Sequence, residues 1–363
     1  MRRVTWNMKI SNYMKKVIEV LKINKKALPI IFLFVSCCLS LVTVANAQFE
    51  LPSIRSIKPV IILNSDPVTP LPNSTVAITA NLSGVIGAGN PNYAWFLNGI
   101  RQTEASGLNK NIFSFKTGAI GTTYRISVNV AIPGASALSD AINLTVSDVD
   151  LTWVANSQAP AAYRAKLMPT QNSIVAISAL SFIYRPGTKN QINSSNLIYN
   201  WIINGKLDLV NSGTDKNSYI LTVNDFLKSD FLIRLEVKTA DGAVSLNKFL
   251  TIPIVRPRVQ LYFFDPETNQ SFGGALKNIT TKPINLNFIA QAYFFNIPEK
   301  HLKWQWLVNN TKVDSQTEKP WSATLNLKDS SLGQFFSTQI KVTAENPDND
   351  LEMGQSIINL EVQ

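Results

Sequence analysis

The 363-residue chain has only two cysteines and one histidine, and the scarcity of both restricts its chemistry. Cys37 and Cys38 are adjacent in an apolar run near the N-terminus, so residues 48–363 contain no thiol. This excludes a disulfide framework, thiolate catalysis and a cysteine-ligated zinc site from that part of the chain. Because His301 is the single histidine, a site with several histidine ligands is excluded as well. His301 precedes a predicted strand and is expected to be a solvated loop residue.

An excess of positive charge is also absent from most of the chain, although its formal net charge is +10. Residues 1–26 hold eight of the 34 Lys and Arg residues but only one of the 24 acidic residues. The rest therefore carries 26 basic and 23 acidic side chains, which nearly balance. A nearly neutral surface lacks the basic patch that nucleic acid binding needs, so we expect no nucleic acid partner.

The N-terminus has the three-part order of a secretory signal peptide. A basic segment, residues 1–26, is followed by the apolar residues 27–44 and then by the small residues Ala45 and Ala47 on either side of Asn46. This order predicts cleavage after Ala47. The apolar run, at about 18–20 residues, is also long enough to be kept as a membrane anchor, and a lipidated Cys37 is a third alternative. All three place the rest of the chain outside the cytoplasmic membrane, because Lys and Arg stay inside.

One short segment occurs three times in the remaining sequence, as Tyr93–Gly99, Tyr199–Gly205 and Trp304–Asn310. Its central tryptophans, Trp95, Trp201 and Trp306, are 106 and 105 residues apart. A period of about 100 residues is too long for a solenoid repeat and is typical of tandem β-sandwich domains.

Each copy of the segment predicts a strand that faces the core and then a tight turn. In the first copy Tyr93, Trp95 and Leu97 alternate, so they point to the same face of a strand. The Asn-Gly pair that follows accepts the positive φ values that a two-residue hairpin turn requires. We therefore assign Trp95 and its two equivalents to the structural core.

No window after residue 47 has helical periodicity, and short alternating segments separated by turn residues follow one another to the C-terminus. We predict an all-β chain of three tandem immunoglobulin-like β-sandwich domains after an N-terminal signal or anchor helix. The predicted boundaries are a signal peptide or signal anchor at residues 1–47, a tether at 48–59, and domains at 60–147, 148–255 and 256–363.

Two motifs resemble those of bacterial immunoglobulin-like and PKD-type repeats. The segment Trp95–Gly99 is similar to the strand of those repeats in which a tryptophan precedes Asn-Gly, and Tyr124–Val128 is similar to their tyrosine-led penultimate strand. The inter-sheet cysteine pair of antibody domains is absent, and so are the acidic residues that usually surround the PKD tryptophan. The resemblance implies a β-sandwich in an exported surface protein and supplies no catalytic activity.

No catalytic residue, metal ligand or cofactor is predicted, although several residues have side chains of a suitable kind for binding. Trp153 and Trp321 lie outside the repeated segment and are the better candidates for stacking on a sugar. Asp148 and Asp150 lie at a domain junction, where calcium would need more oxygen ligands than they supply. The segment Glu345–Glu352 is richer in acid, but its Asn, Pro and Asp residues are also typical of a turn.

A binding surface is expected at the C-terminal end of the third domain, which would be the end farthest from an N-terminal anchor. The predicted loop at residues 267–283 is long and contains the apolar residues Phe272, Leu276 and Ile279. Long loops in compact domains are usually functional or disordered. In an immunoglobulin-like sandwich the Asn309-Asn310 turn lies at the same end. The alternative is that the loop folds back and covers its own domain.

These observations predict an exported, non-enzymatic rod that presents a protein-recognition or assembly surface, as in adhesion, a pilus or an envelope complex. The expected partner is another envelope or extracellular protein or a surface polysaccharide, with the membrane as a partner only if the N-terminal segment is uncleaved. A carbohydrate-binding module array that uses Trp153 or Trp321 is the alternative function. A hydrolase whose carboxylates the sequence does not single out is the third.

Overall fold

The computed structural model describes residues 58–84, 89–224, 228–268, 270–282, 284–315, 317–326 and 336–362. The chain divides into two units, Met1–Lys58 and Pro59–Gln363, and the β-strands lie in the second. The predicted signal or anchor helix and the cleavage residues Ala45 and Ala47 lie outside the described residues. Within the described residues, no helix has the length and hydrophobicity needed to cross a membrane.

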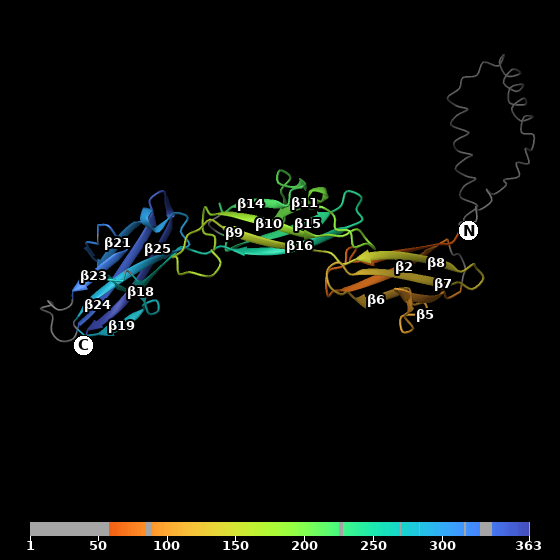
Figure 1. Ribbon diagram of the computed structural model, residues 1–363, viewed down its shortest axis with the longest axis horizontal. Coiled ribbons are helices and arrows are strands. Elements are labelled where there is room, and N and C mark those ends of the chain that lie inside the picture. Colours follow the sequence, from red (N-terminus) through yellow and green to blue (C-terminus); the bar gives the residue numbers. More distant parts are fainter. Residues whose placement is uncertain are drawn as a thin grey trace, which may run out of the picture. The chain divides into compact units, whose positions relative to one another are not determined.

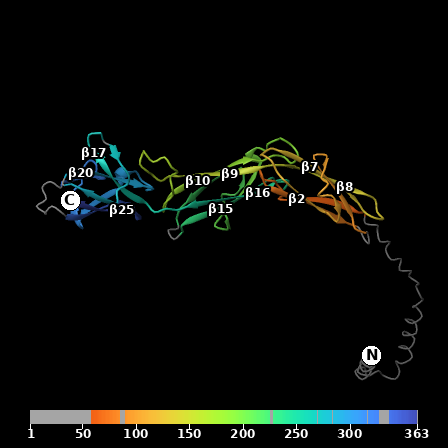
Figure 2. The same cartoon turned by 90° about the horizontal axis from the view of Figure 1, so that it is seen from below.

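The strands form three pairs of sheets (Figure 1 and Figure 2). In the first pair, one sheet has the order β1-β2-β6 and the other β4-β3-β7-β8, with β5 paired to β3. Their bounds are β1 (Val60–Asp66), β2 (Thr75–Ser83), β3 (Asn92–Leu97), β4 (Ile100–Arg101), β5 (Gly107–Leu108), β6 (Ile112–Lys116), β7 (Thr123–Ala131) and β8 (Leu138–Thr145). We call this pair the first sandwich.

The second sandwich repeats this strand order, with sheets β14-β10-β9 and β12-β11-β15-β16 and with β13 paired to β11. A short 3₁₀ helix, η1 (Ser194–Asn196), precedes β11. The bounds are β9 (Asp148–Ala155), β10 (Ile174–Phe182), β11 (Ile198–Ile203), β12 (Lys206–Leu207), β13 (Gly213–Thr214), β14 (Ser218–Thr222), β15 (Asp230–Lys238) and β16 (Ser245–Pro253).

The third sandwich has the same plan with two added strands, β18 and β19, and with no counterpart of β5 or β13 among its described strands. Its sheets are β18-β17-β20-β23 and β19-β25-β24-β21-β22. A second 3₁₀ helix, η2 (Glu299–His301), precedes β21. The bounds are β17 (Arg258–Asp265), β18 (Gln270–Phe272), β19 (Asn278–Thr281), β20 (Asn285–Tyr293), β21 (Lys303–Val308), β22 (Thr311–Val313), β23 (Ser322–Asn326), β24 (Phe336–Asn346) and β25 (Asn349–Val362). Among the described strands of the three sandwiches, all pairings are antiparallel except that of β19 with β25.

This strand order is that of an immunoglobulin-like sandwich, in which a short sheet packs on a longer one through alternating apolar residues. The predicted fold class is therefore confirmed: the described chain is all-β and consists of tandem immunoglobulin-like sandwiches. The strands of each sandwich fall inside the predicted limits 60–147, 148–255 and 256–363, which we keep as working boundaries.

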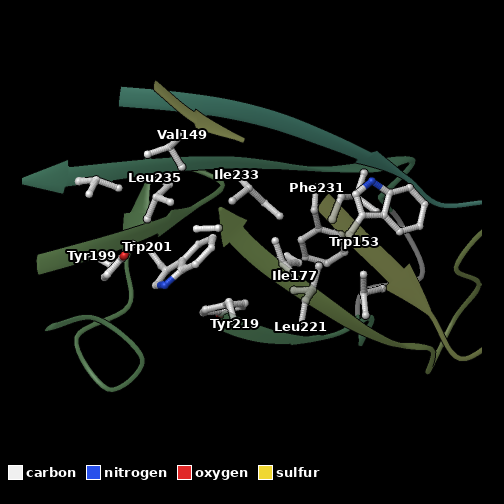
Figure 3. Packing of buried hydrophobic residues seen from close by; sticks show 14 of the residues in the cluster. Val149, Trp153, Ile177, Tyr199, Trp201, Tyr219, Leu221, Phe231, Ile233 and Leu235 are labelled. Carbon is white, nitrogen blue, oxygen red and sulfur yellow. The ribbon is translucent and has the colours of Figure 1, made fainter. Parts of the chain in front are cut away.

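Each core is built around one of the three repeated tryptophans. Trp95 and Trp201 are completely buried and Trp306 is 2% exposed. Figure 3 shows Trp201 beside Tyr219 and Leu235 in the second sandwich. Each indole N–H also donates to a backbone carbonyl, at 2.9 Å to Lys110, 2.8 Å to Lys216 and 2.9 Å to Pro320. The tryptophans thus fill the cores and satisfy their only polar group.

The asparagine that follows each tryptophan strand has two roles. Asn98, Asn204 and Asn309 have φ values of 51°, 49° and 47°, and a residue with positive φ follows each of them, as a two-residue hairpin turn requires. Each asparagine also bonds to the neighbouring penultimate strand with both its backbone N–H and its side-chain oxygen. For Asn309 the partner is Gln339, and both N···O distances are 2.9 Å. Glycine would allow the turn but lacks the side-chain bond.

Hydrogen bonds link residues on both sides of each junction between sandwiches. Ser147 is buried; its N–H donates to the carbonyl of Pro70 at 3.0 Å and its hydroxyl accepts from the N–H of Tyr184 at 3.1 Å. At the next junction Gln158 and Phe295 form an isolated β-bridge, with an N···O distance of 2.6 Å. Backbone groups at both junctions are therefore paired within the protein.

Candidate functional site

The segment at residues 267–283 differs from the predicted long loop, because it contains two short strands, β18 and β19. β18 pairs with β17 and places Phe272 opposite Phe263, with the ring centroids 5.8 Å apart and nearly parallel. The Phe272 side chain is still 54% exposed. It is thus an apolar ring held on a strand and open to solvent on one side.

The positions of Leu276 and Ile279 agree with the alternative prediction, in which the segment covers its own domain. Both are partly buried against the core of the third sandwich. The N–H of Leu276 donates to the carbonyl of Leu261 at 2.8 Å, and Ile279 is paired with Leu360 of β25. These two residues therefore fix the segment to the domain, and only Phe272 of the three predicted apolar binding residues lies exposed.

Four exposed amide side chains follow one another across the longer sheet of the third sandwich. We call these residues, Asn278, Asn309, Gln339 and Asn359, the amide row. Gln339 Nε2 donates to Asn359 Oδ1, and Asn359 Nδ2 donates to Asn278 Oδ1, both at 3.4 Å. The bond from Gln339 N–H to Asn309 Oδ1 completes the row at the predicted turn.

The amide row brings two predicted elements together, because it joins the Asn309-Asn310 turn to the β19 segment. Each primary amide offers two donors and one acceptor, so a row of them can bond to peptide groups or hydroxyl groups without carrying charge. The sequence prediction missed Gln339 and Asn359. Their signal was their place on the polar face of two alternating strands, β24 and β25.

The structure rejects Trp153 as a sugar-stacking residue. Its side chain is only 7% exposed and packs in the core of the second sandwich, as Figure 3 shows. The ammonium of Lys166 lies over the ring, 3.6 Å from its centroid. Burial lowers the pKa of Lys166. Trp321, the other candidate, is partly buried, and its carbonyl accepts from the N–H of Ala290.

A polar groove lies beside Trp304, which is the first residue of the third repeated segment. Trp304 is partly exposed and its indole N–H donates to the carbonyl of Glu299 at 3.2 Å. The groove is lined by Trp304, Gln305, Trp306, Lys312, Val313, Asp314, Ser315 and Thr317. An aromatic surface bordered by amide, hydroxyl and charged groups can bind a sugar or a polar peptide.

The aspartates at the first junction form ion pairs. Lys248 Nζ lies 3.0 Å from Asp148 Oδ1 and 3.9 Å from Asp150 Oδ1. One lysine thus lies within ion-pair distance of both carboxylates. Among the described residues, no cluster of three or more His, Cys, Asp or Glu side chains is placed to hold a metal ion.

The acidic segment Glu345–Glu352 includes a carboxylate that is directed into the protein. Glu352 is 1% exposed and accepts hydrogen bonds from the backbone N–H of Asn296 and from Asn346 Nδ2, the latter at 2.7 Å. Asn349 Nδ2 lies 3.4 Å from the same carboxylate. Amide donors therefore occupy the oxygens that a calcium ion would need.

Glu299 is a second largely buried carboxyl group, and it makes the third sandwich sensitive to pH. Burial raises the pKa of Glu299 from its ordinary value of 4.5 to about 6, partly opposed by a hydrogen bond from the N–H of Ala292. The folded state thus favours the protonated form of Glu299. The stability that this preference contributes to the folded state is complete below pH 4.5 and is lost as pH rises through about 6.

We therefore predict that Glu299→Gln makes the third sandwich more stable than the wild type at pH 8 by up to about 2 kcal/mol, and that the gain disappears at pH 4. Urea unfolding at the two pH values measures this difference. The matched control is Glu267→Gln, which removes the same charge from an exposed position. An equal gain at both pH values would contradict the assignment to Glu299.

No protein-family model and no curated protein matches the chain. Similar solved structures are arrays of sandwich domains. The three N-terminal domains of the highly immunogenic outer capsid protein of bacteriophage RB49 are 10% identical, with 84% of this chain and 99% of theirs covered and a TM-score of 0.25. The central fibronectin-III array of RIM-binding protein is 12% identical, with 85% and 98% covered and a TM-score of 0.28.

A third similar structure is SGBP-B from the mixed-linkage glucan utilization locus of Bacteroides ovatus, solved with a mixed-linkage heptasaccharide. It is 10% identical, with 84% of this chain and 70% of that chain covered and a TM-score of 0.20. TM-scores this low carry no argument about function. The assignment of the fold rests on the strand order and register described above.

Proposed function

We propose that the protein is an exported, non-enzymatic surface protein whose three sandwiches form a stiff array that presents a recognition surface on the third. The observation that carries this proposal is the way consecutive sandwiches are joined. β8 ends at Thr145 and β9 begins at Asp148, and β16 ends at Pro253 and β17 begins at Arg258. Neither connection contains a flexible Gly/Ser linker.

Side-chain hydrogen bonds between neighbouring sandwiches oppose bending at the junctions. Thr145 Oγ1 donates to the carbonyls of Arg185 and Thr188, at 3.2 and 3.1 Å. Ser173 Oγ donates to Asn296 Oδ1 at 2.6 Å, and Asn296 Nδ2 donates to the carbonyl of Gln171 at 2.6 Å. Bending at either junction would break bonds that are at least partly shielded from water, which costs more than breaking exposed ones.

The proposed recognition surface is the amide row together with Phe272 and Asn310. It combines an exposed ring with uncharged donors and acceptors, a composition that is common where proteins bind other proteins. We propose that the partner is another envelope or extracellular protein. Export follows from the basic, apolar and small-residue order of residues 1–47, and the same segment, if uncleaved, would attach the protein to the membrane.

Site-specific photo-crosslinking on intact cells tests this function. A photoreactive phenylalanine in place of Phe272 is expected to capture a protein of the envelope or its surroundings. The same residue in place of Leu108, which is 64% exposed on the first sandwich, is the control and should capture none. Equal capture from both positions, or capture from neither, would contradict a recognition surface on the third sandwich.

The groove beside Trp304 favours binding of a surface polysaccharide as the second candidate function. Trp304→Ala would then abolish retention of the protein in gels that contain the polysaccharide and would leave crosslinking from Phe272 unchanged. Gln305→Ala, which removes a polar residue from the same groove, should weaken retention less than loss of the ring does. Unchanged retention in the Trp304 variant would reject this candidate.

A further inference from the structure

The second sandwich has an open pocket at a place where the loops of the other two sandwiches touch. The pocket has a volume of about 520 Å³. It lies between residues 183–197, which connect β10 to β11, and residues 239–244, which connect β15 to β16. A volume of about 300–1,000 Å³ is typical of a site for a small ligand. The equivalent loops connect β2 to β3 and β7 to β8 in the first sandwich, and β20 to β21 and β24 to β25 in the third.

Direct contacts close the equivalent space in the other two sandwiches. In the first, a Cβ atom added to Gly89 would lie 3.4 Å from Pro133 Cγ, so the described part of one loop leaves little room beside the other. In the third, the backbone N–H and the side-chain amide of Asn296 both donate to the carboxylate of Glu352, which follows the β24–β25 turn. Among the described residues of the second sandwich, no hydrogen bond joins the two loops, and the space between them stays open.

Both loops of the pocket are held by the first sandwich. Thr145 Oγ1 donates to the carbonyls of Arg185 and Thr188 in one loop. Thr69 Oγ1 accepts from the N–H of Ser245, which directly follows the other loop, at 2.9 Å. The walls of the pocket are therefore fixed before a ligand arrives, which lowers the entropy that is lost on binding.

The lining of the pocket holds one positive and one negative side chain, Arg185 and Asp241. No described residue forms a hydrogen bond or a salt bridge with the guanidinium of Arg185. Hydrogen bonds from the Thr239 hydroxyl and the Ala243 N–H lower the pKa of Asp241, and the nearby charge of Arg185 lowers it further. The pocket thus presents a guanidinium and a carboxylate at neutral pH.

This lining favours a small dipolar ligand over a sugar. A ligand with one charge of each sign matches the two opposite charges of the pocket. None of the lining residues is aromatic, so a sugar ring has no flat face on which to stack. Ile192 and the buried Val244 offer apolar surface to a small side chain. Short peptides with free ends combine both charges with such a side chain.

We propose that this pocket, which we call the junction pocket, binds a short zwitterionic peptide, with the peptide carboxylate at Arg185 and the ammonium group near Asp241. A guanidinium donates two parallel hydrogen bonds to a carboxylate, which fixes the orientation of the ligand. The side-chain amide of Asn196, also in the lining, can donate to and accept from the peptide bond. The junction pocket belongs to the second sandwich, so it does not depend on the proposed recognition surface of the third.

Calorimetric and NMR titrations of the full-length protein with three dipeptides test the two charges. Ala-Ala carries both charges, its C-terminal amide lacks the carboxylate, and acetylated Ala-Ala lacks the ammonium group. We expect the amide to bind about tenfold more weakly than Ala-Ala, because a bidentate pair is lost. The acetylated form should bind about threefold more weakly, because an exposed ion pair contributes less.

Three outcomes would overturn the proposal. Equal affinity for Ala-Ala and its acetylated form would replace the short zwitterion with the carboxyl end of a longer chain. Binding of glucuronate as tight as that of Ala-Ala would replace the peptide with an acidic sugar. No binding of any of these probes would show that the junction pocket is not a site for a carboxylate ligand.

Two variants and a control make the test specific to the junction pocket. Arg185→Met keeps a long side chain without the guanidinium and should weaken Ala-Ala binding about tenfold. Ala240→Phe narrows the pocket without changing either charge and should weaken the binding of all three dipeptides. Both side chains are exposed, so both variants should keep the wild-type melting temperature.

The matched control is Lys189→Met, which removes an exposed cation from the same loop but outside the lining. This variant should bind Ala-Ala as the wild type does. An equal loss of affinity in the Lys189 and Arg185 variants would overturn the assignment to Arg185. Undiminished binding in a folded Arg185 or Ala240 variant would overturn the pocket as the binding site.

Discussion

Replacing Trp201 with alanine is expected to lower the free energy of unfolding of the second sandwich by about 3–5 kcal/mol, the usual cost of truncating a large buried aromatic side chain. The ring is completely buried and packs against Tyr219 and the β15 strand. The substitution also removes the indole N–H that satisfies the carbonyl of Lys216. A loss of this size is a large part of the stability of a domain of about 100 residues.

Denaturant unfolding with domain-resolved hydrogen exchange measures this effect. The second sandwich should lose protection, and the first and third should keep theirs, because their cores form separate clusters. Phe249→Ala is the matched control, since Phe249 lies in the same sandwich and is 62% exposed. A Trp201→Ala protein with wild-type stability would show that the buried tryptophan contributes little to the free energy of unfolding of the second sandwich.

Replacing Glu352 with leucine is expected to destabilise the third sandwich by about 3–5 kcal/mol. The carboxylate accepts from Asn296 and Asn346, and each buried donor left without an acceptor costs about 1–3 kcal/mol. Asn346 is itself buried, so water cannot easily replace the lost partner. The effect should extend to the junction, because Asn296 also bonds to the carbonyl of Gln171.

Glu352→Gln should be less damaging, since it keeps the shape and one acceptor oxygen while turning the other oxygen into a donor. Asp350→Asn is the control because Asp350 is exposed in the same segment. Urea unfolding gives the stabilities, and limited proteolysis at residues 254–257 reports on the junction. If Glu352→Leu and Asp350→Asn changed stability equally, the buried carboxylate would have no special role in holding this end of the domain.

The tryptophan strands and their turns could be predicted because their signals are local. Alternation over Tyr93, Trp95 and Leu97 gives the face, and Asn-Gly gives the turn, without knowledge of any distant residue. The same alternation along β9 identifies Trp153 as a core residue and not as an exposed sugar-binding residue. Val149, Trp153 and Ala155 are separated by even numbers of residues and are all buried.

The candidate site could not be predicted in the same way because long-range pairing creates it. β19 is a strand only because it lies beside β25, and its Asn278 bonds to Asn359, 81 residues away. Leu276 and Ile279 are apolar in either a binding loop or a covering segment, so composition does not separate the two outcomes. The amide row depends on the register of β24 with β25, which local sequence does not encode.

Small-angle X-ray scattering of the protein in dilute solution tests the central claim, a stiff array of three sandwiches, most directly. Sandwich strands of about 10 residues at 3.3 Å each predict an array on the order of 100–120 Å long, which corresponds to a radius of gyration of about 30 Å. A single compact body of this chain length would have a radius of gyration of about 21 Å. A value near 30 Å that stays constant with salt is the predicted result, and a value near 21 Å would contradict the account.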